Sequence, residues 1–229
     1  MDIVNKEYEK VLRFVLKNTD IFTAHERKYL LDYALRGHYE GKMIPDLVME
    51  VYDKLKLLED KDNIYLGFID LLDDNFNYRD KSIVEVGGGI IPSLADRISH
   101  NQISGKIKVY DPRLSKYEKN KEKLTLVREK FYSNTPVDNT DLLIGFMPCE
   151  ATYNIIDSAT RNNIDFMIAL CEGGPHGDIY DYFEDEREWL NTIIYMAERG
   201  VEDNNMGTLE KVYLKEYHNP YPVIYNRRK

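Results

Sequence analysis

The stretch SIVEVGGGIIPSLADRIS, residues 82–99, is the part of the chain that says most about its fold. A short apolar run leads through Glu85 to three consecutive glycines, and a helical pattern begins near Pro92. Glycine loses much conformational entropy on ordering and has no side chain to pack, so three in a row indicate a requirement of the backbone. The requirement is either a tight strand-to-helix turn or a loop that a nucleotide-like ligand approaches closely.

The sequence that follows this turn alternates short apolar runs with helical patterns, which favours a parallel sheet with helices on both faces. Strands are expected at residues 83–86, 107–110, 124–127, 142–146 and 166–170, and a helix at 189–199. Two more strand-like runs, 211–217 and 223–225, predict an antiparallel pair at the end of the sheet. The predicted fold class is therefore α/β, a Rossmann-like, doubly wound, mostly parallel sheet with an antiparallel C-terminal strand pair.

The sequence before the turn predicts an all-helical N-terminal region. The first helix should bury one stripe of apolar residues, namely Val4, Tyr8, Val11, Leu12 and Val15. Thr23 and Glu26 form a capping box that opens a second helix, which should stop near Gly37. Pro45 can begin a third helix, and a fourth should begin near residue 62. We therefore expect a helical region over residues 1–78 and a Rossmann-like domain over residues 79–229.

Length, composition and charge limit the class of protein. A chain of 229 residues with 43% hydrophobic residues can build one medium domain with a small extension. Its net charge of −9 disfavours non-specific nucleic-acid binding. The two cysteines, Cys149 and Cys171, predict neither a disulfide scaffold nor a metal site. Because we find no signal-peptide pattern and no apolar run near the ~18 residues of a membrane span, we expect a cytoplasmic protein with no membrane partner.

Two classes of ligand compete for the glycine turn. In the dinucleotide-binding fingerprint G-x-G-x-x-G, a helix N-terminus holds a pyrophosphate. Gly87 and Gly89 fill the first two glycine positions of that fingerprint, but Pro92 or Ser93 stands at the third. Glu85 also lies two residues before the first glycine, where a carboxylate would repel a pyrophosphate. The turn therefore suits a ligand that carries an ammonium group.

At these residues the sequence resembles the class I S-adenosylmethionine-dependent methyltransferases, a Rossmann-like superfamily. Their first motif is an acidic residue, any residue, and then glycines at alternate positions. Glu85, Gly87 and Gly89 match that motif, and Ile91 stands in place of the last glycine. Their second strand ends in an acidic residue, which Asp111 matches. The resemblance covers about residues 80–200, and it implies S-adenosylmethionine as cofactor and methyl transfer as activity.

The same resemblance implies roles for residues at the open ends of the strands. Glu85 and the glycine loop would contact the methionine part of the cofactor. Asp111 would hold the ribose hydroxyls, and Phe131, after the third strand, would flank the adenine. The complete set of cofactor-binding residues that it implies is Glu85, Gly87, Gly88, Gly89, Asp111, Pro112, Phe131, Met147 and Pro148.

The acceptor should react where the fourth and fifth strands end, in GFMPCEAT and ALCEGGPHGD. Glu150, Glu172 and His176 are the ionisable residues there, and each is a candidate catalytic base. Each also has a simpler interpretation: Glu150 as a helix cap, Glu172 as a solvated loop residue and His176 as a turn residue. Methyl transfer from a sulfonium needs no acid and often no strong base, so positioning can supply much of the rate.

Known signatures of particular methyltransferases do not match this region. Nitrogen methyltransferases carry Asn or Asp followed by Pro-Pro-Tyr or Pro-Pro-Phe, whereas Met147 and Pro148 stand at the equivalent place. Cys149 and Cys171 are similar in position to the cysteines of cytosine-5 RNA methyltransferases, but the surrounding motifs differ. Such cysteines usually serve as small core residues. The pattern also resembles, loosely, a group of tRNA 2′-O-methyltransferases.

Two charged segments bear on the acceptor. Residues 178–188, DIYDYFEDERE, hold six acids and one arginine, interleaved with aromatic residues, and would attract an amine. Residues 106–130 hold nine Lys or Arg and four Asp or Glu, so RNA stays a candidate substrate. For each segment a solvated helix face is the simpler interpretation, and we favour it. We favour a small-molecule acceptor, an amine among the candidates; the alternatives are an RNA methyltransferase and a non-catalytic, methyltransferase-like binding protein.

Overall fold

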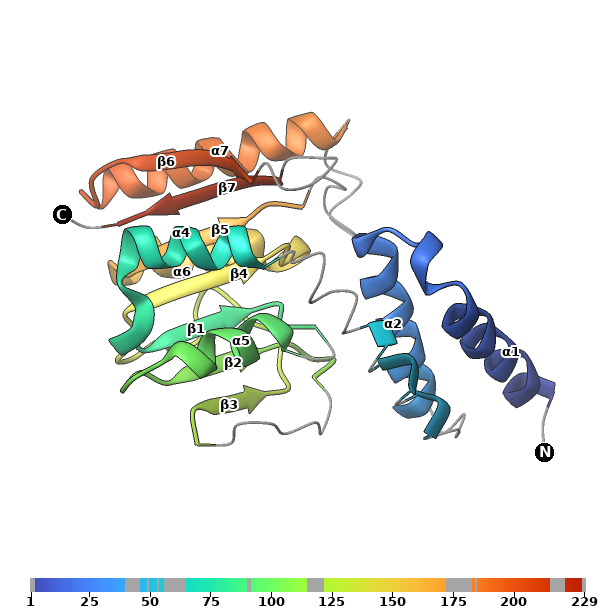
Figure 1. Cartoon of the computed structure of the whole chain (residues 1–229). Coiled ribbons are helices and arrows are strands. Elements are labelled where there is room, and N and C mark those ends of the chain that lie inside the picture. Colours follow the sequence, from blue (N-terminus) through green and yellow to red (C-terminus); the bar gives the residue numbers. More distant parts are fainter. Residues whose placement is uncertain are drawn as a thin grey trace. The chain divides into compact units, whose positions relative to one another are not determined.

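The computed structural model describes residues 3–39, 46–48, 50–52, 54–55, 65–89, 92–114, 122–171, 183, 185–214 and 221–227. The chain forms two compact units, residues 1–66 and 67–229. Figure 1 shows the first as helices only and the second as a sheet with helices around it. The boundary between the units lies before the boundary expected between residues 78 and 79. Nearly all of the helix α4 (Leu66–Phe76) belongs to the second unit.

The first unit contains α1 (Ile3–Lys17), a short 3-10 helix η1 (Thr19–Ile21), α2 (Ala24–Tyr39), and helical residues between 46 and 55. In α1, Tyr8, Leu12 and Val15 are buried as expected, whereas Val11 is 37% exposed and lies at the margin of the stripe. Pro45 and residue 62 lie outside the described residues.

The second helix begins as the sequence predicts and ends later than it predicts. The Thr23 backbone N–H donates to Glu26 Oε2 at 2.8 Å, and the Glu26 N–H donates to Thr23 Oγ1 at 3.3 Å, so the capping box is formed. The helix continues through Gly37 to Tyr39, and the Tyr8 ring of α1 fills the space where a side chain at position 37 would lie. Gly37 thus serves close helix packing rather than helix termination.

The second unit is built on one seven-stranded sheet in the order β3-β2-β1-β4-β5-β7-β6. Strands β1 to β5 are parallel, β7 is antiparallel to β5, and β6 is antiparallel to β7. Their bounds are β1 Ile83–Val86, β2 Ile107–Tyr110, β3 Leu124–Val127, β4 Leu142–Phe146, β5 Asp165–Ala169, β6 Leu209–Leu214 and β7 Tyr221–Asn226. This arrangement confirms the predicted Rossmann-like fold class.

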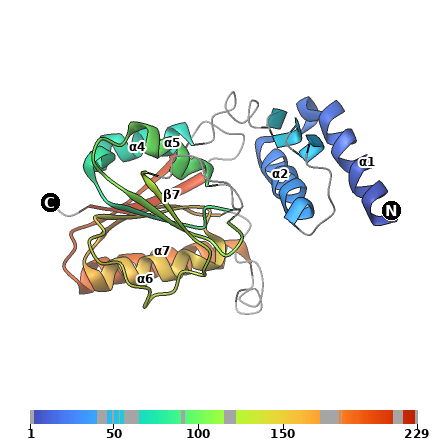
Figure 2. The same cartoon turned by 90° about the horizontal axis from the view of Figure 1, so that it is seen from below.

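Helices cover both faces of the sheet. Figure 2 shows α4 and α5 (Ser93–Asn101) on one face, and α6 (Thr152–Asn162) and α7 (Glu186–Asp203) on the other. The α4 face is held by edge-on aromatic pairs, with Phe68 packing on Phe146 of β4 at 5.5 Å between ring centroids. Every residue of β1, β4 and β5 is buried, which explains why these strands are mostly apolar in the sequence, with Glu85 in β1 and Asp165 in β5 as the charged exceptions.

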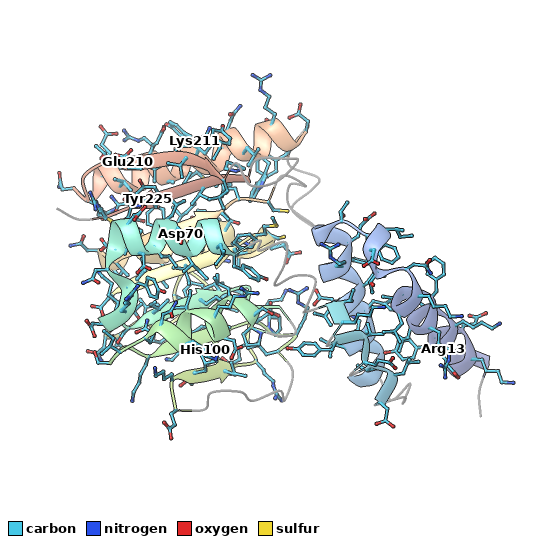
Figure 3. All side chains as sticks on the ribbon, in the orientation of Figure 1. Arg13, Asp70, His100, Glu210, Lys211 and Tyr225 are labelled. Carbon is cyan, nitrogen blue, oxygen red and sulfur yellow. The ribbon has the colours of Figure 1, made fainter. Side chains whose placement is uncertain are left out.

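The C-terminal elements differ slightly from the expected bounds. The helix α7 is longer than 189–199, because the Asp185 carboxylate accepts the Glu188 N–H at 2.8 Å and caps an earlier start. Strand β6 begins earlier than residue 211, and residues 215–217 lie outside the described residues. Figure 3 labels Glu210 and Lys211 on β6 and Tyr225 on the paired strand β7. Among the helices that the structure describes, none is long and apolar enough to cross a membrane.

Candidate functional site

The backbone of the turn after β1 explains the three glycines. Gly87 and Gly89 have φ angles of +82° and +75°, in the left-handed region that disfavours residues with a side chain. A Cβ on Gly87 would lie 3.0 Å from the Pro148 Cα, so the turn also touches the segment after β4. A Cβ on Gly88 would lie 2.5 Å from the Val109 Cγ1, so that glycine lets the turn pack on β2.

The carboxylate of Glu85 is directed into the fold. Its side chain is buried in β1, and Oε2 accepts the Ala95 backbone N–H of the first turn of α5 at 3.1 Å. A carboxylate at a helix N-terminus is stabilised by the helix dipole and satisfies an otherwise unpaired N–H. Glu85 therefore fastens α5 to β1, and its expected contact with a ligand ammonium group stays a prediction.

Asp111 lies directly after β2, is 3% exposed, and accepts hydrogen bonds on both oxygens. Oδ2 accepts the Gly89 N–H at 2.9 Å, which ties the end of β2 to the glycine turn after β1. Oδ1 accepts the Arg113 backbone N–H at 2.8 Å, which forms a tight turn. The Arg113 guanidinium adds a fork, with Nε 3.1 Å from Oδ1 and Nη2 3.0 Å from Oδ2.

These contacts determine the ionisation of Asp111. Burial by itself would raise the pKa of the carboxyl group. The Arg113 guanidinium, together with the backbone N–H groups of Arg113 and Gly89, outweighs burial and holds the pKa below its usual value. Asp111 is therefore an anion at neutral pH, at the end of a buried strand.

A cavity of about 470 Å³ opens where the parallel strands end, within the size range of small-ligand sites. Its walls come from the ends of β1, β2 and β4 and from the segment after β3. The sheet order reverses between β1 and β4, the place where open α/β sheets bind ligands. The lining includes seven of the expected site residues, namely Gly87, Asp111, Pro112, Phe131, Met147, Pro148 and Glu150. Glu85, Gly88 and Gly89 support the turn without lining this cavity.

One wall of the cavity is aromatic. Phe131 is buried after β3 and packs edge-on against Tyr110 of β2, with 5.4 Å between ring centroids. Tyr132, which is exposed, and Lys130 line the same wall. The neighbouring segment is anchored to α6, because Asn154 Oδ1 accepts the Ser133 N–H at 3.2 Å.

Another part of the cavity lining is a strained turn after β4. Met147 and Cys149 have φ angles of +52° and +47°, a conformation that costs free energy in residues with side chains and is concentrated at functional sites. The Met147 N–H donates to the Ala169 carbonyl at 2.8 Å, and the Ala151 N–H donates to the Pro148 carbonyl at 3.0 Å. The turn is thereby fixed from two sides.

Of the three candidate bases, the structure describes one. Glu150 is exposed in the 3-10 helix η3 (Cys149–Ala151) and lines the cavity. Glu172 and His176 lie outside the described residues. Cys149 and Cys171 form no disulfide. Among the described residues, no group of three His, Cys, Asp or Glu is placed to hold a metal ion.

Sequence reasoning did not predict a site role for Arg113, Lys130, Tyr132 or Asn154, which also line the cavity. The signal for Arg113 was present in the run Asp-Pro-Arg, because an aspartate two residues before an arginine can form a turn that brings the two side chains together. No comparable signal marks the other three.

No protein-family model and no curated protein sequence matches the chain. Solved structures are similar to it at low identity. Precorrin-6y C5,15-methyltransferase from Geobacter metallireducens GS-15 is 17% identical over 66% of this chain and 81% of that chain, with a TM-score of 0.42. Magnesium protoporphyrin IX methyltransferase from Synechocystis PCC 6803, with S-adenosylmethionine bound, is 11% identical over 78% and 83%, with a TM-score of 0.48. Aeropyrum pernix fibrillarin, with natively bound S-adenosylmethionine, is 14% identical over 65% and 66%, with a TM-score of 0.46.

Proposed function

We propose that this chain binds S-adenosylmethionine and transfers its methyl group to a small-molecule acceptor. One observation carries the proposal. The buried, ionised carboxylate of Asp111 lies on the cavity at the switch point of the sheet and is hydrogen-bonded to the left-handed glycine turn after β1. The motif resemblance through Glu85, Gly87 and Gly89 supports the same assignment.

The residues around the cavity fit the chemical groups of the cofactor. Asp111 offers anionic acceptors for a ribose diol, and Gly87 offers backbone without a side chain in the way. Phe131 and its edge-on partner Tyr110 offer an apolar aromatic wall for adenine. The contacts of Glu85, Gly88 and Gly89 hold this constellation in place, which is the pre-organisation that a binding site needs.

The cofactor supplies a methyl group that its positively charged sulfur has already activated. The protein then has to orient the acceptor and exclude water, which can supply roughly 7–11 kcal/mol of the barrier. We assign to the fixed turn around Met147 and Pro148 the cofactor contact that the resemblance implies, and with it the wall that orients the acceptor. Glu150 lines the cavity and can accept a proton from the acceptor, and Glu172 and His176 stay candidates for the same task.

A small molecule is favoured as acceptor over RNA. The net charge of −9 opposes the approach of a polyanion, and the cavity is of a size that encloses a small ligand. An amine is one candidate, because the acids of residues 178–188 would attract a cation. Of these acids, Asp185 has a structural task as the cap of α7.

Isothermal titration calorimetry with S-adenosylhomocysteine tests the cofactor assignment. We expect saturable binding well below millimolar concentration, and failure to bind at millimolar concentration would overturn the proposal. Labelled methyl transfer from S-adenosylmethionine to fractions of a metabolite extract, with total tRNA in parallel, then identifies the acceptor class. Transfer to tRNA, together with gel retardation that weakens with salt, would replace the small-molecule acceptor by RNA.

A further inference from the structure

The Asp111 carboxylate has no hydrogen-bonding capacity left over in this structure. A carboxylate offers about four lone-pair positions. Two of them accept the backbone N–H groups of Gly89 and Arg113, and two accept Nε and Nη2 of the Arg113 guanidinium. The two backbone donors belong to the turns that shape the site. The two guanidinium donors match in number the two hydroxyl groups of a ribose.

We propose that the Arg113 side chain and the ribose diol of the cofactor compete for Asp111, so that Arg113 must leave the carboxylate when the cofactor binds. This inference rests on the proposed function, since it concerns the same site. Arg113 thereby sets the affinity for adenosyl ligands, without being part of the contact that holds them.

The different burial of the two side chains explains why such a competitor exists. Asp111 is 3% exposed, and a buried carboxylate without partners is strongly destabilising. The Arg113 side chain is 50% exposed and lines the cavity, so its charge can be solvated when it swings away. Arg113 can therefore satisfy Asp111 in the ligand-free protein and be replaced at modest cost.

The size of the effect follows from the exposure of the ion pair. A half-exposed fork of this kind favours the closed arrangement by a factor of about two to five. Because apparent affinity falls in proportion to the fraction of protein that is competent to bind, removing the fork should tighten binding about three- to sixfold.

The test compares Arg113→Met, which keeps an unbranched stem and removes the fork, with Arg128→Met as a matched control. Arg128 is an exposed arginine after β3 that does not line the cavity. Calorimetry uses S-adenosylhomocysteine, adenosine and 2′,3′-dideoxyadenosine. We expect Arg113→Met to bind the first two ligands about three- to sixfold more tightly than the parent, and 2′,3′-dideoxyadenosine no more tightly. Arg128→Met should match the parent for all three.

Arg113→Lys is a second variant in case Arg113→Met does not fold. It keeps the charge but not the fork geometry, so its affinity for S-adenosylhomocysteine should lie between those of the parent and Arg113→Met. Binding of S-adenosylhomocysteine by Arg113→Met that equals or is weaker than the parent's would overturn the competition and leave the proposed function standing. An equal gain for the dideoxy ligand would also overturn it, since the gain would then not pass through the diol. Absence of binding in the parent and in every variant would overturn both proposals.

Discussion

Replacing Asp111 by alanine is the sharpest test of where the cofactor binds. In the proposed complex the carboxylate accepts two ribose hydroxyls, each worth roughly 1.5–3 kcal/mol as a hydrogen bond to a charged group. The ligand displaces the half-exposed Arg113 fork, whose loss subtracts about 1 kcal/mol. The net loss on Asp111→Ala is therefore about 2–5 kcal/mol, or about 30-fold to 4,000-fold in affinity.

Calorimetry with S-adenosylhomocysteine near neutral pH measures this loss. Asp111→Asn should bind with intermediate affinity, because the amide keeps the shape and one acceptor but loses the charge. Asp138→Ala, which removes an exposed acid from the loop before β4, is the matched control and should bind like the parent. Unaltered binding by a folded Asp111→Ala protein would refute the placement of the ribose at the end of β2.

The stability of Asp111→Ala is part of the same test. The carboxylate also accepts the N–H groups of Gly89 and Arg113, so its removal leaves these donors without that partner. A buried unsatisfied donor costs about 1–3 kcal/mol, and a lower melting temperature is therefore expected. Binding has to be compared at a temperature at which circular dichroism shows both proteins folded.

Three further predictions concern stability. The folded-state pKa of Asp111 lies below its unfolded value of about 3.9. Its contribution to the free energy of unfolding is therefore present above that value and is lost as pH falls through the folded pKa. The difference in unfolding free energy between about pH 7 and pH 3, measured in urea, should shrink in Asp111→Asn. Gly87→Ala should cost about 1–3 kcal/mol of stability and weaken S-adenosylhomocysteine binding, because the new Cβ meets Pro148 at a left-handed position; a variant as stable as the parent would contradict the turn geometry. Burial raises the pKa of Tyr78 above its usual value of about 10. Its contribution to the free energy of unfolding is therefore complete below that pH and is lost as pH rises through the folded pKa. In Tyr78→Phe the unfolding free energy measured in urea should fall less between about pH 9 and pH 11 than in the parent.

The fold was accessible from the sequence because its central strands are buried on both sides. A strand such as β4 must be apolar at every position, and such runs stand out between helical patterns. Asp111 was found through the resemblance, which places an acidic residue at the end of the second strand, and the structure has it directly after β2. The capping box of Thr23 and Glu26 was equally readable, because both partners are local in sequence.

Features that depend on long-range packing were not accessible. Gly37 has the sequence of a helix end, but the Tyr8 ring from another helix makes it a packing position inside α2. Glu85 fits a ligand-binding motif, which stays a prediction, and its hydrogen bond from the first turn of α5 is a contact that the motif does not predict. Arg113 is a different case, because its contacts with Asp111 are local and the run Asp-Pro-Arg carried a signal for them that was overlooked. Glu172 and His176 lie outside the described residues and stay predictions.

The two edge strands of the sheet affect how readily molecules of this protein aggregate through strand pairing. An edge strand presents unpaired N–H and C=O groups on which a strand of another molecule can grow, and proteins oppose this with short edges and charged side chains. Here one edge, β3, is only four residues long. The other, β6, carries the exposed charges of Glu210 and Lys211, which Figure 3 labels. Both edge strands thus discourage edge-to-edge aggregation. The ligand cavity lies elsewhere in the sheet, at the carboxyl ends of the parallel strands.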